Sequence, residues 1–229
     1  MCGRYAIYGP VSLSREAKAA ADDMGIDLEG LLDHRDPLYN IAPTHKPPIL
    51  VHAVDGYVMK GTRWGLIPSW AKDEKIGSKL INARVETVAE KPSFRAAFKK
   101  RRCLVPASGY FEWKGAAGAK QPYFIRDPDG RLVMFAGLWE AWKRTDEADW
   151  LHTFTIITGE PGKVSGDIHD RQPVILPAAS WMDWLTDEAE IAQHILTQAP
   201  EAPLTYYPVS KAVGSPRNQG PELVAPIDL

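Results

Sequence analysis

Apolar residues along the chain fall mainly into short runs of strand length, separated by glycine, proline and aspartate. Two Asp-Gly pairs interrupt these runs and predict hairpin turns. Asp55-Gly56 would join strands at residues 49–54 and 57–64, and Asp129-Gly130 would join strands at residues 123–126 and 132–135. Further strands are predicted at residues 4–8, 110–114, 153–158, 174–176 and 205–207.

Helical periodicity is confined to a few segments. Helices are predicted at residues 15–24, 93–101, 180–185 and 187–196. The second of these places Phe94, Ala97 and Phe98 on one face. Ser180 and Thr186 are potential N-terminal caps of the last two helices.

Hairpin-linked strands with irregularly interspersed helices predict an α+β fold. We expect a mostly antiparallel, barrel-like β-sheet core with a few surrounding helices, because a doubly wound fold would need regular alternation of strands and helices. Residues 1–229 are expected to form a single domain. The Pro/Gly-rich segment 209–229 is expected to dock on it through Leu223, Val224 and Ile227, the alternative being that this segment is disordered.

Composition is that of an ordinary globular protein, with 45% hydrophobic and 24% charged residues in a chain of 229. No apolar run approaches the length of a membrane span, and no secretory signal is visible, so we expect a cytoplasmic protein. Nothing in the sequence suggests an obligate partner, so we expect a monomer. Cysteines are limited to Cys2 and Cys103, which cannot build a disulfide framework or a cysteine-rich zinc site. We interpret Cys103 as a small core residue.

The formal net charge of −2 argues against a protein that is basic throughout and binds nucleic acid with its whole surface. Positive charge is nevertheless concentrated in one stretch without acidic residues, formed by Lys91, Arg95, Lys99, Lys100, Arg101 and Arg102. Charge alone favours a solvated helix face for this stretch. The alternative is a ridge that binds phosphates.

Cys2 would gain unusual chemistry if Met1 were removed. Removal is expected because the Cys2 side chain, which follows the initiator Met, is small. An α-amine with a pKa of roughly 7.7–8.0 and a thiol near 8.5 would then lie on adjacent carbons. Such a 1,2-aminothiol reacts with aldehydes, because the amine forms an imine and the sulfur closes a five-membered thiazolidine ring. The alternative is that residue 2 is incidental and the terminus frays.

Three other segments place polar side chains where packing does not require them. Asn82 and Arg84 would point to the same face of an extended segment. Glu112 lies within an aromatic strand, where burial would raise its pKa and suit it to proton transfer. His169 adjoins Asp170 and Arg171. Each of these residues also has a purely structural interpretation. Asn82 could cap a turn, Glu112 could form an ion pair within the sheet, and His169 could be a hydrogen-bonded loop histidine.

Metal binding has little support in the sequence. The six histidines include no pair at helical i, i+4 spacing, and no carboxylate motif links them. We therefore expect neither a metal nor another cofactor.

Taken together, the segments resemble the SOS response-associated peptidase (SRAP) family of abasic-site-processing proteins. The resemblance spans nearly the whole chain, through several motifs in the family's order. These are Met1-Cys2-Gly3-Arg4, Tyr39-Asn40-Ile41-Ala42-Pro43-Thr44, Arg63-Trp64-Gly65-Leu66-Ile67-Pro68-Ser69-Trp70-Ala71, Asn82-Ala83-Arg84, Cys103-Leu104-Val105-Pro106, Gly109-Tyr110-Phe111-Glu112-Trp113, His169-Asp170-Arg171 and Asn218-Gln219-Gly220-Pro221-Glu222-Leu223. One departure is Gln172, where the family commonly has Met.

The resemblance implies covalent capture of abasic sites in single-stranded DNA during the DNA damage response. Cys2 would form a thiazolidine crosslink with the ring-opened sugar after removal of Met1, which a self-processing peptidase activity could perform. Asn82 would hold the Cys2 end and the sugar, and His169 would act on the sugar oxygen. Glu112 would serve as acid and base for imine formation and for slow, lyase-like reversal.

The resemblance also implies a DNA interface. Arg4, Arg84 and Arg171 would bind phosphates that flank the lesion. Trp70, and with it Trp64, could stack on bases.

Two other functions are compatible with the residues. A peptidase with a cysteine nucleophile would use Cys2, His169 and either Glu112 or Asn82 on peptide substrates. A non-catalytic module would bind single-stranded DNA through the basic stretch and aromatic residues, independently of Cys2.

Overall fold

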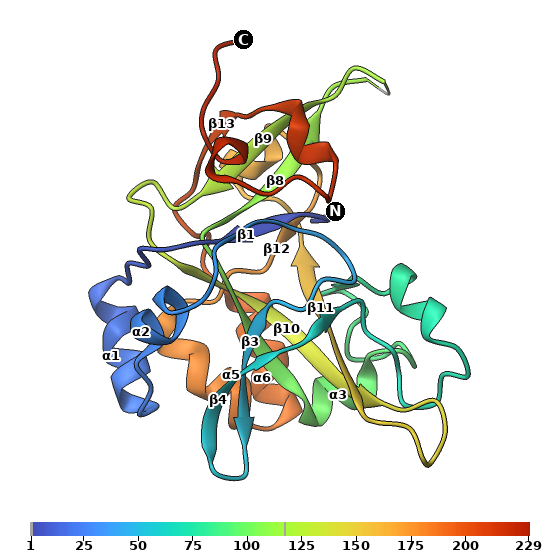
Figure 1. The fold of residues 1–229 in the computed structure, drawn as a ribbon. Helices are drawn as coiled ribbons and strands as arrows, with labels where there is room; N and C mark the ends of the chain where they lie inside the picture. Colours follow the sequence, from blue (N-terminus) through green and yellow to red (C-terminus); the bar gives the residue numbers. More distant parts are fainter. Residues whose placement is uncertain (1, 117) are drawn as a thin grey trace.

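A computed structural model describes residues 2–116 and 118–229 and confirms the predicted α+β class, with mostly antiparallel sheet (Figure 1). One sheet has the strand order β13-β9-β8-β1-β2 and is antiparallel throughout. Its strands are β1 (Tyr5–Ile7), β2 (Leu38–Ile41), β8 (Gly109–Lys114), β9 (Gln121–Arg126) and β13 (Thr205–Pro208).

The second sheet has the order β12-β11-β10-β7-β3-β4, also antiparallel along this path. Two short strands, β5 and β6, instead run parallel to β11. The strands are β3 (Pro48–Ala53), β4 (Gly56–Gly61), β5 (Arg63–Trp64), β6 (Asn82–Arg84), β7 (Arg102–Ala107), β10 (Val133–Trp142), β11 (Leu151–Gly159) and β12 (Gln172–Pro173).

The helices are short and lie around the sheets. Figure 1 shows α1 and α2 at one side of the second sheet and α3, α5 and α6 toward its lower end. They are α1 (Arg15–Asp23), α2 (Leu28–Asp33), α3 (Arg95–Lys100), α4 (Lys163–Gly166), α5 (Trp181–Thr186) and α6 (Ala189–Gln198). The 3₁₀ segments are η1 (Glu74–Lys79), η2 (Ala178–Ser180), η3 (Lys211–Gly214) and η4 (Pro221–Leu223).

The four predicted helices are confirmed as α1, α3, α5 and α6, while α2 and α4 were not predicted. Ser14 caps α1, because its side chain accepts a hydrogen bond from the Ala17 amide. The expected cap at Thr186 is wrong, since Glu188 is the N-terminal flanking residue of α6. The Thr186 hydroxyl instead donates to the Met182 carbonyl within α5.

The first predicted hairpin is confirmed. Strands β3 and β4 pair from Pro48↔Gly61 to Ala53↔Gly56. Gly56 has a φ of 114°, a conformation that favours glycine and explains the turn at Asp55-Gly56.

The second predicted hairpin is wrong. Strand β9 pairs with β8 and β13, whereas β10 pairs with β7 and β11, so Asp129-Gly130 joins two different sheets. The Asp127 carboxylate accepts hydrogen bonds from the amides of Asp129 and Arg131, which closes the turn without a strand ladder. Leu132 then donates its amide to Ser12, leading the chain away from β9.

A strand at residues 174–176 is also not observed. The strand here is β12 at Gln172–Pro173, and Ile175 forms only an isolated bridge to Phe135.

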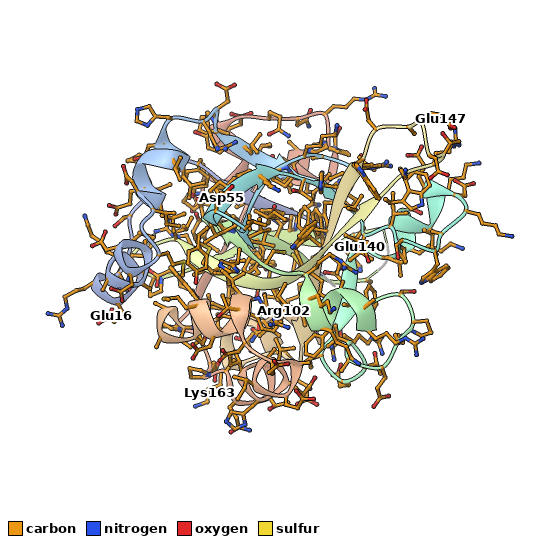
Figure 2. The ribbon with its side chains drawn as sticks, turned by 90° about the horizontal axis from the view of Figure 1, so that it is seen from below. Glu16, Asp55, Arg102, Glu140, Glu147 and Lys163 are labelled. Atoms are coloured by element: carbon orange, nitrogen blue, oxygen red, sulfur yellow. The ribbon has the colours of Figure 1, made fainter. Side chains whose placement is uncertain are left out.

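The residues of the basic stretch fall into two groups, two arginines that take part in packing and four side chains that are exposed. Arg102 is buried and donates to the carbonyls of Phe98 and Lys99 in α3 and of Trp184 in α5. Arg101 forms an ion pair with buried Glu140, with Nε and Oε1 2.7 Å apart. Figure 2 shows Arg102 and Glu140 inside the outline of the molecule. These two arginines therefore stabilise the fold, and the expectation of a solvated face holds only for exposed Lys91, Arg95, Lys99 and Lys100.

Cys103 is fully buried on β7, as expected of a core residue. Its carbonyl accepts a hydrogen bond of 2.9 Å from the Trp184 indole, which ties α5 to the sheet. Across residues 2–116 and 118–229, no helix has the length and apolar character needed to cross a bilayer.

The C-terminal segment is held by Asn40, which is fully buried at β2. Its Nδ2 donates to the carbonyls of Val213, Ser215 and Asn218 at 2.9–3.2 Å. Gln219 completes the clamp, because its side chain accepts from the Asn40 amide and donates to the Asn40 carbonyl. The motifs at residues 39–44 and 218–223 are therefore two sides of one contact.

Loss of this clamp should lower the stability of the fold. We expect Asn40→Ala to reduce the free energy of unfolding by about 3 kcal/mol, because several buried carbonyls lose their donor. Asn218→Ala, which removes one exposed side-chain bond to Ala212, should cost about 1 kcal/mol or less. Urea denaturation measures both, and equal midpoints for the two variants would contradict the assigned role.

Candidate functional site

The site is built around Cys2, which begins the described chain and has no exposed surface. The Asn82 Nδ2 donates to the Cys2 carbonyl at 2.7 Å. Asn82 is placed there by the parallel pairing of β6 with β11, in the register Asn82↔Ile156. Burial raises the pKa of the Cys2 thiol well above its usual range, and the nearby Glu112 carboxylate raises it further. The thiol is therefore protonated at neutral pH.

Glu112 extends from β8 into the same region. Only 3% of its surface is exposed, and burial raises its pKa, in the direction expected from its aromatic strand. A positively charged His169 would oppose this shift. Glu112 is thus a carboxyl group that keeps its proton to a higher pH than a solvated glutamate.

His169 lies in the loop that connects α4 to β12. Its amide donates to the Ser165 carbonyl at 2.9 Å, which anchors the loop to α4. The ring Nε2 lies 4.0 Å from the Glu112 Oε2. The ring Nδ1 accepts the Arg171 amide at 3.0 Å and lies 2.8 Å from the Asp170 Oδ1.

Arg84 and Arg171 line an open cleft of about 680 Å³ together with His169 and Asp170. Arg84 is exposed at the end of β6. The Arg171 side chain is only 14% exposed and is bonded to both Glu86 oxygens. Of these two guanidinium groups, Arg84 is therefore the more accessible to a phosphate.

The remaining predicted DNA-binding residues differ in their exposure. Arg4 is partly buried and donates to the carbonyls of Gly3 and Gly214, so the C-terminal segment holds it. Trp70 is 57% exposed, and its indole donates to the Pro92 carbonyl at 3.3 Å. Trp64 is fully buried, with its indole donating to Ile81 at 2.8 Å. The expectation that Trp64 stacks on bases is therefore wrong.

Sequence reasoning assigned no role to several residues that shape the site. Glu86 holds Arg171, although it lies 85 positions away in the sequence. Buried Ser165 donates its hydroxyl to Gln172, the position that departs from the family pattern. This bond gives Gln172 a polar partner and links α4 to β12. The only sequence signal for Glu86 is its position two residues after Arg84, which makes it a polar residue beside a candidate site.

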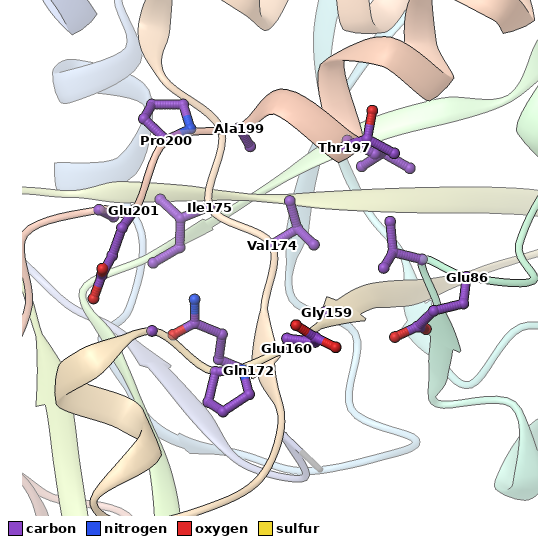
Figure 3. Close-up of a pocket in the computed structure, with 15 residues that line it drawn as sticks. Glu86, Gly159, Glu160, Gln172, Val174, Ile175, Thr197, Ala199, Pro200 and Glu201 are labelled. Carbon is purple, nitrogen blue, oxygen red and sulfur yellow. The ribbon is translucent and has the colours of Figure 1, made fainter.

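A second cleft of about 460 Å³ adjoins the site between the end of β11 and the segment after α6. Figure 3 shows Glu86 and Glu201 at opposite ends of this cleft, with Gln172 between them. Among the described residues, no three His, Cys, Asp or Glu side chains are grouped so that they could hold a metal ion.

Comparison with known proteins gives consistent matches over nearly the whole chain. The model of the family described as SOS response associated peptidase (SRAP) matches residues 1–216. Abasic site processing protein YoqW of Bacillus subtilis is 39% identical over 98% of this chain and 99% of its own. Abasic site processing protein HMCES of Pongo abelii is 32% identical over 100% of this chain and 77% of its own.

A solved structure supports the same relationship. A protein from Bacteroides thetaiotaomicron has a TM-score of 0.74 and 28% identity, covering 99% of this chain and 100% of its own. The family match, the two relatives and the shared fold lead to one conclusion. The chain belongs to the SOS response associated peptidase family.

Proposed function

We propose that this protein recognises abasic sites in single-stranded DNA and captures them as a covalent thiazolidine crosslink through Cys2. The crosslink would shield the lesion during the DNA damage response. The names of the relatives, abasic site processing proteins, support the target. The residues around Cys2 support the chemistry.

The observation that carries the proposal is the placement of Cys2. Asn82 binds its carbonyl at 2.7 Å, and Glu112 is close enough to raise the pKa of its thiol. His169 stands 4.0 Å from Glu112. An amine, a thiol, a carboxyl group with a raised pKa and an imidazole would therefore meet at one sugar aldehyde.

The amine must be created before the reaction, because the Cys2 nitrogen is an amide while Met1 is attached. Met1 itself lies outside the described residues. Co-translational removal of Met1, or self-processing by a peptidase activity, would expose the amine. The free amine would then attack the aldehyde to give a carbinolamine, which loses one water to become an imine.

The next proton transfers would run between Glu112, the leaving hydroxyl and the Cys2 thiol. Protonated Glu112 would donate to the leaving hydroxyl and become a carboxylate. That carboxylate would accept the thiol proton as sulfur bonds to the carbon of the N-protonated imine, and the electron pair of the C=N bond would return to the nitrogen, which keeps its proton as the ring N–H. The same steps in reverse would release the DNA slowly. His169 would donate to the sugar oxygen and favour the ring-opened aldehyde.

Arg4, Trp70 and Arg84 would contact the DNA strand, with Arg171 beside them. Exposed Trp70 can stack on a base without regard to sequence, and exposed Arg84 can bind a phosphate. The net charge of −2 suits this arrangement, because covalent capture needs few phosphate contacts.

A cysteine peptidase that acts on other proteins is the main alternative. It requires a base that activates the thiol. In this structure burial and Glu112 both raise the pKa of the Cys2 thiol, which disfavours the thiolate. Aldehyde capture is favoured because an amine can attack first.

The covalent step can be tested with single-stranded DNA carrying one abasic site. Protein whose loss of Met1 is verified by mass spectrometry should give a one-to-one adduct that survives denaturing electrophoresis. Cys2→Ser should give a band only after borohydride reduction, because its amine can form an imine but no ring. Cys103→Ala, which removes the other thiol, should leave the adduct intact. Absence of an adduct from the mature wild type would refute the proposal.

Glu112 should set the alkaline limb of the pH profile. The capture rate should rise as the amine loses its proton and fall as Glu112 loses its own, at a pH above that of an ordinary carboxyl group because its pKa is raised. Glu112→Gln should lower the rate by roughly 100- to 10,000-fold and abolish the alkaline fall. Quenched time courses from pH 5 to 9 measure this, and a variant that keeps the fall would show that another group causes it.

Trp70 should contribute to binding before the covalent step. Trp70→Ala is expected to weaken binding of lesion-free single-stranded DNA by roughly 5- to 150-fold, the loss of one stacked base. Trp150 provides a matched control, because it is 58% exposed and lies just before β11, where Lys143 contacts its ring. Fluorescence anisotropy should show unchanged binding for Trp150→Ala. Equal losses in both variants would exclude a specific role for Trp70.

A further inference from the structure

Arg171 makes contacts that phosphate binding does not explain. Its Nη1 donates to the Glu86 Oε1 at 2.5 Å, and its Nη2 donates to the Glu86 Oε2 at 3.0 Å. The same Nη2 also donates to the Thr158 carbonyl at 2.6 Å. Paired bonds to a carboxylate fix the orientation of a guanidinium group as well as its position. The Arg171 side chain is thus bound to the segment that follows β6 and to the end of β11.

Glu86 is the partner that fixes this geometry. It follows β6 by two positions, and β6 is itself fixed to β11 at Arg84↔Thr158. The Arg171 hydrogen bonds are the largest cause that lowers the pKa of Glu86, so its carboxylate stays charged at neutral pH. The ion pair therefore persists at neutral pH.

Fixing Arg171 also fixes its backbone, which contacts His169. The Arg171 amide donates to the His169 Nδ1 at 3.0 Å. A nitrogen that accepts a hydrogen bond carries no proton, so this hydrogen bond favours the neutral ring that has its proton on Nε2. The Nε2 atom faces Glu112 and lies 4.0 Å from the Glu112 Oε2.

Asp170 places a hydrogen-bond acceptor beside Nδ1, whereas the Arg171 amide is a donor. Its Oδ1 lies 2.8 Å from the same nitrogen and can pair with it only when Nδ1 is protonated. The Asp170 side chain is 88% exposed, so water weakens this attraction. The Arg171 amide and the Asp170 carboxylate therefore favour different protonation states of one ring nitrogen.

We propose that Glu86 is a positioning residue that acts through Arg171 to select the Nε2–H tautomer of His169. With Glu86 in place, the Arg171 amide occupies Nδ1 and Nε2 presents its proton to the site. Without it, the loop loses its anchor to β6, and protonation of Nδ1 toward Asp170 becomes competitive. The kinetic consequence rests on the proposed function, whereas the tautomer itself does not.

The tautomer can be measured without DNA. Nitrogen-15 spectra of the His169 ring distinguish a protonated from a bare nitrogen. Wild type at a pH where the ring is neutral should show a bare Nδ1 and a protonated Nε2. Glu86→Gln and Arg171→Gln should each give a mixture that includes protonated Nδ1, and the double variant should match the single ones. Glu160→Gln is the matched control, because this carboxylate lines the same cleft, whereas the Arg171 side chain forms its hydrogen bonds with Glu86 and Thr158.

Capture kinetics provide the second measurement. Glu86→Gln should lower the maximal rate of crosslink formation roughly tenfold, as loss of a supporting contact around a reactive group does, with the half-saturating DNA concentration unchanged. A folded Glu86→Gln protein that keeps the wild-type ring spectrum would overturn the proposal. A rise confined to the half-saturating concentration would also overturn it, because Arg171 would then be a phosphate ligand. If wild type formed no adduct, the proposed function would fail while the spectra still decided the tautomer.

Discussion

The hydrogen bond from Asn82 to the Cys2 carbonyl is the contact on which the site depends. An N-terminal residue has few neighbours along the chain to restrain it, and termini usually fray. Here β1 begins three residues after Cys2, and the amide of Asn82 fixes Cys2 from the opposite sheet. Asn82 in turn takes its position from the parallel pairing of β6 with β11. The two sheets thus meet at the residue whose chemistry is proposed to capture the lesion.

Burial is the main cause of the pKa shifts of the acidic groups in this site. Both the Cys2 thiol and the Glu112 carboxyl group have raised pKa values, because each would have to carry negative charge away from water. A thiol and a carboxyl group that both hold their protons to a higher pH than usual suit a reaction that begins with amine attack and needs an acid to expel water. They suit thiolate attack on a peptide poorly. The same environment therefore favours one candidate chemistry over the other.

Local sequence rules predicted the elements better than their partners. The Asp55-Gly56 hairpin is correct because adjacent strands β3 and β4 share a sheet. The hairpin predicted at Asp129-Gly130 is wrong, because the residues of a turn do not show whether the flanking strands, here β9 and β10, belong to the same sheet. Trp64 and Trp70 cannot be separated from sequence, yet one is buried and the other exposed. The contacts of Asn40 with Gln219 and of Glu86 with Arg171 join residues 179 and 85 positions apart, which no local pattern reports.

The central claim is that amine and sulfur of Cys2 both bond to one sugar carbon. The most direct test is a tandem mass spectrum of the trypsin-digested adduct, made without any reducing agent. The account predicts the sugar on the peptide Cys2-Gly3-Arg4, with a mass equal to peptide plus aldehyde minus one water and with no free thiol. A sugar attached to a lysine, or a Cys2 peptide that still reacts with a thiol reagent, would contradict it.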